Sequence, residues 1–174
     1  MQVYDWQAIV TEHGPAVWQT AYRLLGNRAD AADCFQETFL AALEFSRHQP
    51  VRHIPGLLVR LATTRAIDRL RQRTRHGQYR ACGSAAPCFG DACDPAVEAE
   101  TKELSHRLRQ AIAELPPQEA KAFCLRYFSE LSYREVAREL NIRTSAAGVL
   151  LHRAKGRLRE ILSAGKHRTN EVSS

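Results

Sequence analysis

The chain of 174 residues is long enough for one domain or two small ones, and its 44% hydrophobic content is sufficient for compact cores. Its net charge is +6, and no apolar run approaches the roughly eighteen residues that a membrane-spanning helix needs. Five cysteines without a regular framework favour free thiols in a reducing compartment over a disulfide scaffold. Since no charged-then-apolar leader is seen either, we expect a cytoplasmic protein without membrane insertion.

Helix signals dominate the N-terminal part. Asp5 and Asp30 are suitable N-caps, Gly14-Pro15 is expected to interrupt a helix, and Gly26 is expected to end one. No stretch alternates polar and apolar residues over a useful length, so no sheet is expected. The expected helices cover residues 5–12, 15–25, 30–49 and 55–73.

The composition then changes to Gly, Ala, Pro and Asp over residues 76–100, which predicts a linker with some helix at its end. Residues 60–80 before it hold seven Arg against Asp68 alone, whereas residues 81–101 hold four acidic side chains and no basic one. The next helix is expected from about Val97 to Leu115, in a part of the chain that is basic again. Two basic blocks indicate two modules that face nucleic acid.

The C-terminal block has the pattern of a helix-turn-helix. Pro116-Pro117 opens a helix, Ser132 and Glu135 fit a capping box, and residues 141–144 form the turn. Thr144 or Ser145 would cap the last helix, which is expected to end at Gly165. Its apolar stripe is expected to contain Val149 or Leu150, then Ala154, Leu158 and Ile161 or Leu162.

The opposite face of this last helix is basic, as a helix that meets DNA phosphates must be. The alternative is a three-helix bundle whose charged side is simply solvated. The turn spacing, the caps and the single sign of the charge favour DNA.

Residues 30–39, DAADCFQETF, followed about thirty residues later by LATTRAIDRLRQR, resemble region 2 of the extracytoplasmic-function (ECF) sigma factors, small initiation subunits of bacterial RNA polymerase. The C-terminal block resembles region 4 of the same family. The resemblance implies an all-α protein of two small helical domains joined by a flexible linker. The expected parts are region 2 at 1–76, the linker at 77–101, region 4 at 102–165 and a tail at 166–174.

The resemblance also implies site residues. Region 2 would bind the clamp coiled coil of the largest polymerase subunit through Asp33, Gln36, Glu37 and Phe39. The −10 promoter element would be contacted by Thr64, Arg65, Arg69, Arg71, Arg73 and Arg75. The −35 element would be contacted by Arg143, Thr144, Ser145, His152, Arg153, Lys155 and Arg157.

Three points follow from the residues themselves. Asp33, Gln36 and Glu37 are three and four apart, so they share one helix face. Asp68 and Arg71 are spaced to form an ion pair. At the start of the last helix, residues 146–150 are Ala-Ala-Gly-Val-Leu, which supply few donors for base edges, so direct base readout is expected to be weak.

The sequence thus predicts an ECF sigma factor that binds bacterial core RNA polymerase, directs it to −10 and −35 promoter elements and helps to melt the promoter. The expected partners are core polymerase, promoter DNA and an anti-sigma factor. No catalytic residues, cofactor or metal are expected, because no phosphate-binding glycine loop or Ser/His/Asp set is present.

Two alternatives remain. One is a helix-turn-helix transcriptional regulator that acts without polymerase; the other is a protein that sequesters a polymerase subunit, which leaves the arginine run unexplained. A redox- or metal-responsive linker is a separate hypothesis for Cys82, Cys88 and Cys93, although their spacing is not that of common zinc sites.

Overall fold

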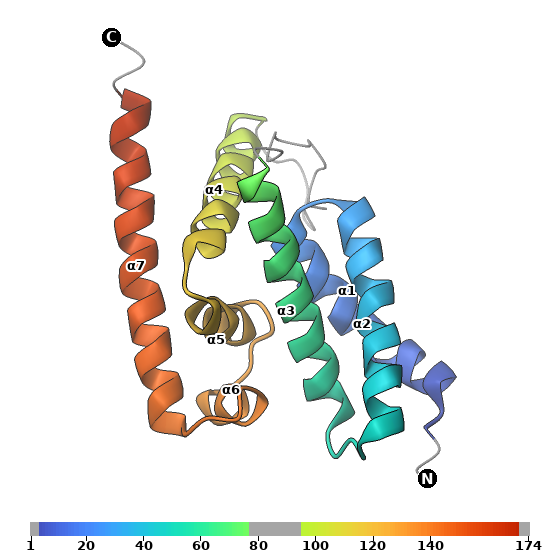
Figure 1. The fold of residues 1–174 in the computed structure, drawn as a ribbon. Coiled ribbons are helices and arrows are strands. Elements are labelled where there is room, and N and C mark those ends of the chain that lie inside the picture. Colours follow the sequence, from blue (N-terminus) through green and yellow to red (C-terminus); the bar gives the residue numbers. More distant parts are fainter. Residues whose placement is uncertain (1–3, 77–94, 171–174) are drawn as a thin grey trace.

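The computed structural model describes residues 4–76 and 95–170, with side chains described at 4–76 and 101–164, and these residues form helices without any strand. The all-α class is confirmed. The helices are α1 (Trp6–Leu25), α2 (Arg28–His48), α3 (Ile54–Arg75), α4 (Pro95–Glu114), α5 (Pro117–Tyr127), α6 (Tyr133–Glu139) and α7 (Thr144–Asn170). Figure 1 shows α1–α3 as one bundle, with α5 and α6 between α3 and the long α7.

Local caps set most helix ends as expected. The Asp5 side chain accepts a hydrogen bond from the Ala8 amide, and Gly26 ends α1 in the left-handed region at a φ of 73°. Asn27, not Asp30, caps α2, because its side chain accepts from the Asp30 amide. Pro117 is the first residue of α5, where a missing N–H costs nothing.

Two expected helix boundaries are wrong. Helix α1 continues through Gly14-Pro15, because burial of Val17 and Ala21 on its inner face outweighs the one backbone hydrogen bond that the proline removes. Helix α7 continues past Gly165 to Asn170. Glycine permits a left-handed cap but does not impose one, since a helical glycine costs only about 1 kcal/mol relative to alanine.

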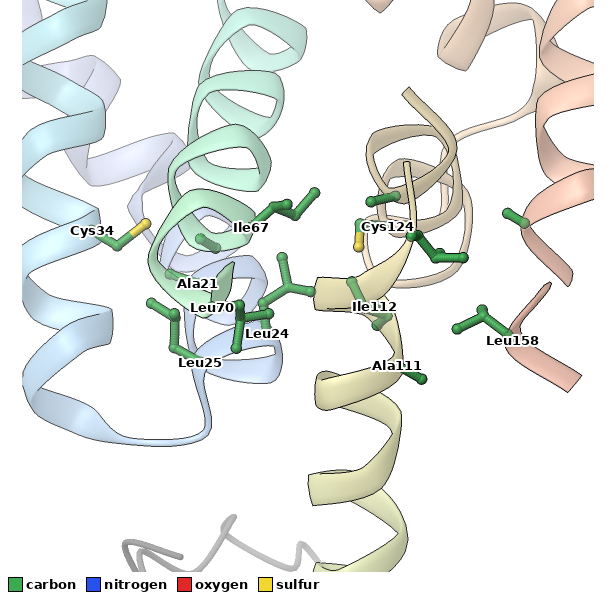
Figure 2. Packing of buried hydrophobic residues seen from close by; sticks show 14 of the residues in the cluster. Ala21, Leu24, Leu25, Cys34, Ile67, Leu70, Ala111, Ile112, Cys124 and Leu158 are labelled. Carbon is green, nitrogen blue, oxygen red and sulfur yellow. The ribbon is translucent and has the colours of Figure 1, made fainter. Parts of the chain in front are cut away.

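The largest core is built from both halves of the chain. Leu24, Ile67 and Leu70 from α1 and α3 pack with Ile112 of α4 and Leu158 of α7 in one buried cluster, drawn from close by in Figure 2. A second cluster lies inside the helix-turn-helix, and a third lies among α1, α2 and the first half of α3. The expected partition at residues 1–76 and 102–165 therefore describes two sequence segments whose side chains share a core.

Helix α3 makes the contact between these segments and touches α1, α2, α4, α5 and α6. Its Val59 packs against the core of the helix-turn-helix. The Arg60 guanidinium donates to the Glu139 carbonyl at 3.4 Å, and the buried Glu139 carboxylate lies 3.4 Å from His53 Nδ1. Gly56 sits directly under this carboxylate, so that a Cβ there would overlap Glu139 and His53.

Gly56→Ala is therefore expected to destabilise the protein by about 1–3 kcal/mol, although alanine is the better helix former, because the added methyl overpacks the α3–α6 contact. Gly148→Ala is the matched control. Nothing lies within 4 Å of its added Cβ, so it should gain up to about 1 kcal/mol. Urea unfolding followed by Trp fluorescence measures both. If Gly56→Ala raises the free energy of unfolding as much as Gly148→Ala does, the α3–α6 contact does not form in solution.

Candidate nucleic-acid and protein interfaces

The expected polymerase-binding residues fall on two sides of α2. Asp33, Gln36 and Glu37 are exposed together, as their spacing predicts. Phe39 lies on the inner side, where it packs in a core cluster and its ring centre is 4.9 Å from that of Phe35. Leu40, four residues after Gln36, is instead 64% exposed beside the polar three. We call Asp33, Gln36, Glu37 and Leu40 the α2 face. Leu40 could have been predicted from the sequence, because residues four apart, such as Gln36 and Leu40, share a helix face.

Arginines of α3 lie against this face. Arg69 forms ion pairs with Glu37 and with Asp33, whose Oδ2 is 3.5 Å away, and Arg73 pairs with Asp30. The side chains of Arg69 and Arg73 remain 25% and 30% exposed. These ion pairs join part of the expected polymerase-binding set, Asp33 and Glu37, to part of the expected −10 set, Arg69 and Arg73, in one charged surface across α2 and α3.

The other expected −10 residues differ in exposure. Thr64 and Arg65 are half-buried, and Arg75 is exposed near the end of α3. The expected ion pair of Arg71 with Asp68 is wrong: the Arg71 guanidinium donates to the Leu115 carbonyl at 2.7 Å. It does so because Leu115 is the last core residue before α5, and its carbonyl faces α3 across the shared core.

The helix-turn-helix has the geometry that its sequence predicts. The Ser132 hydroxyl accepts from the Glu135 amide, and the Glu135 carboxylate accepts from the Ser132 amide at 2.8 Å, which completes the capping box. The turn passes through Asn141 at a φ of 53°, a left-handed conformation that asparagine tolerates. Ala147 and Leu151 of α7 then pack on Val136 and neighbouring core residues.

The expected −35 residues lie along α7 and just before it. Five of them are exposed and form no ion pair with another described residue: Arg143, Thr144, Ser145, His152 and Arg153. The remaining two are held by α5. Lys155 Nζ lies 5.1 Å from the Tyr127 ring centre, and Arg157 Nε lies 3.0 Å from the buried carboxylate of Glu119. Removing Arg157 would leave a buried charge without its partner, so this arginine also holds α5 against α7.

The apolar stripe of α7 contains the expected Ala154 and Leu158, and it also includes Ala147 and Leu151. Ala147 and Leu151 are buried, Leu150 is partly buried, and Val149 is 49% exposed. Sequence periodicity had favoured Val149 or Leu150 for the core. A stripe starting at Ala147 fits the same spacing, but the small alanine gave a weak signal.

The described thiols are structural. Burial raises the pKa of the Cys34 and Cys124 thiols, so both stay protonated and unreactive. Cys82, Cys88 and Cys93 lie outside the described residues. In the described part of the chain no His, Cys, Asp or Glu side chains gather into a ligand set for a metal ion, and no helix has the length and apolarity to cross a bilayer.

Hydrogen bonding with Ser132 lowers the pKa of the Glu135 carboxyl, which gives the helix-turn-helix a pH-dependent stability. A lowered folded-state pKa means that this contribution is complete above the unfolded pKa of about 4.3 and disappears as the pH falls through the folded value. Glu135→Ala should therefore have a lower urea midpoint of unfolding than wild type at pH 7, and the difference should be smaller at pH 3.

The matched control is Glu160→Ala on α7, which removes an exposed carboxylate that caps no helix. It should leave the urea midpoint nearly unchanged at both pH values. If Glu135→Ala lowers the urea midpoint by as much at pH 3 as at pH 7, the ionised carboxylate of Glu135 does not stabilise the cap.

Comparisons with known proteins agree with this geometry. Residues 9–76 match the family model "Sigma-70 region 2", and residues 105–158 match "Sigma-70, region 4". The ECF RNA polymerase sigma factor SigE of Mycolicibacterium smegmatis is 30% identical over 98% of this chain. This chain spans only 65% of the length of SigE. SigW of Bacillus subtilis, also an ECF sigma factor, is 30% identical over 88% of this chain and 87% of its own.

The same fold occurs among solved structures. The sigma factor RpoE of Bartonella quintana, crystallised with the anti-sigma factor NepR, superposes with a TM-score of 0.57 over 92% of this chain and 98% of its own, at 20% identity.

Proposed function

This chain belongs to the ECF sigma factors of RNA polymerase, and from that premise we propose that it binds bacterial core RNA polymerase and directs it to promoters with −10 and −35 elements. Its own contribution is binding and promoter opening, while nucleotide chemistry belongs to the polymerase. This work takes place in the cytoplasm, where the polymerase acts on the chromosome.

The observation that supports this function most strongly is the α2 face. Asp33, Gln36 and Glu37 precede Leu40 along α2, and Leu40 is an apolar side chain left 64% exposed next to them. A large exposed apolar side chain next to polar ones is a feature of protein-binding surfaces. A regulator that acts without polymerase needs no such face beside its arginines, so this surface favours the sigma factor over the helix-turn-helix regulator.

Promoter melting needs cations that follow a single strand, and α3 supplies them next to the α2 face. Arg69 and Arg73 are paired with carboxylates at a partly exposed surface, where each ion pair contributes only about 0–1 kcal/mol. Exchanging such a carboxylate for a DNA phosphate therefore costs little. We assign these two arginines, with Thr64, Arg65, Arg71 and Arg75, to the −10 strand.

The −35 element is assigned to the helix-turn-helix, with α7 as its recognition helix. Arg143, Thr144 and Ser145, just before and at the start of α7, are exposed to solvent, as residues that enter a major groove must be. Arg143, Thr144, Ser145, His152 and Arg153 would hold the phosphates, with Lys155 and Arg157 at the edge of the contact.

An anti-sigma factor is the third partner that we propose. The solved sigma factor of the same fold was crystallised with one. The α2 face is a suitable place for it to bind, since a protein that covered Leu40 would also cover the neighbouring charges and keep the polymerase away.

Binding to core polymerase tests the proposal. Gln36→Ala should weaken retention of core polymerase on the immobilised protein by about tenfold, because one interface hydrogen bond with a desolvated partner contributes about 1–2 kcal/mol. Gln36 makes no contact that would change the fold, whereas Glu37 also holds Arg69, so the single variant gives the cleaner result.

Gln7→Ala on α1 is the control, since it makes the same substitution at an exposed helical position that does not belong to the α2 face. It should retain polymerase like wild type. If wild type does not bind core polymerase but still shifts duplex DNA, the helix-turn-helix regulator replaces the sigma factor.

A further inference from the structure

Among the described side chains of α7, one large hydrophobic side chain is exposed next to polar ones. Val149 is 49% exposed, and it lies one turn from Ser145 on one side and from Arg153 on the other, both exposed. Residues four apart share a helix face, so these three form one row that points away from the core. We call Ser145, Val149 and Arg153 the α7 row.

The length of the α7 row matches the width of the groove that it would enter. Its ends, Ser145 and Arg153, are eight positions apart in the sequence. At about 1.5 Å per residue the row is about 12 Å long, close to the width of the major groove. With Ser145 and Arg153 toward the phosphates on the two sides, the middle of the row faces the base edges. That middle position is Val149.

Valine has no hydrogen-bonding group, so the base edge that it fits must be apolar. The 5-methyl of thymine is the apolar group that base pairs expose in the major groove. Valine is also well suited to this contact, because its side chain has one strongly preferred rotamer in a helix and loses little freedom on binding.

The neighbouring residue allows a close approach. At Gly148 nothing of this chain lies within 4 Å of the place that a Cβ would occupy, so no packing requires glycine there. Its missing side chain lowers the helix surface beside Val149 and lets the valine methyls reach the base edge.

We propose that Val149 is a specificity-determining residue that reads a thymine methyl group in the −35 element. The inference rests on the proposed function and names the base that its recognition helix prefers. Residues 146–150 have few side chains that can donate hydrogen bonds to base edges, and the apolar contact of Val149 would provide base readout instead.

The test uses the full chain together with bacterial core polymerase. Duplexes are selected from a library randomised over the upstream element, and each thymine of the selected sequence is then replaced in turn by deoxyuridine, which pairs identically but lacks the methyl. For wild type, one replacement should weaken binding about fourfold, as expected for one buried methyl. With Val149→Ala, the thymine and deoxyuridine duplexes should bind equally.

Alanine favours the helix more than valine does, so a loss of discrimination cannot come from unfolding of α7. Val10→Ala is the matched control: it truncates an exposed valine on α1 and should keep the fourfold preference. The role of Val149 would be overturned, and the proposed function left standing, by either of two results. One is that wild type selects duplexes that are not enriched in thymine; the other is that Val149→Ala still prefers thymine to deoxyuridine. A library from which wild type selects nothing would overturn the proposed function as well.

Discussion

The burial of α3 between the two halves of the chain is the constraint on which the rest of the structure depends. Ala66, Ile67 and Leu70 are fully buried on the side that meets α1 and α4, and Val59 reaches the core of the helix-turn-helix. Short helices such as α6, with seven residues, are not stable alone in water. Their stability comes from cores that include α3, so the recognition helix is positioned by residues more than seventy positions away in the chain.

The same helix carries, on its other side, arginines that we propose contact promoter DNA. With 3.6 residues per turn, the residues between the buried ones point outward, and in α3 these include Arg60, Arg65 and Arg69. Packing and DNA contact therefore do not compete for the same positions. The exception is Arg71, which binds the Leu115 carbonyl and so belongs to the junction with α4 and α5. Its substitution would affect both the fold and DNA binding.

Much of this architecture was predictable from sequence because the signals are local. Capping residues such as Asp5 and Ser132 act within one helical turn, and the spacing of Gln36 and Glu37 depends only on the helix. What failed depends on contacts between distant segments. The pairing of Arg69 with Glu37, the insertion of Val59 into the helix-turn-helix and the continuity of α1 through Pro15 are all decided by tertiary packing. The sequence left Val149 and Leu150 as alternatives for the core, because Ala147 is too small to mark the buried stripe clearly.

Transcription in a purified system tests the central claim most directly. Core polymerase is incubated with sheared bacterial DNA, with and without this protein, and the 5′ ends of the transcripts are mapped. The account predicts that the protein creates discrete start sites, preceded by two shared sequence elements at a constant spacing. Start sites that are the same with and without the protein, while it still binds duplex DNA, would contradict it.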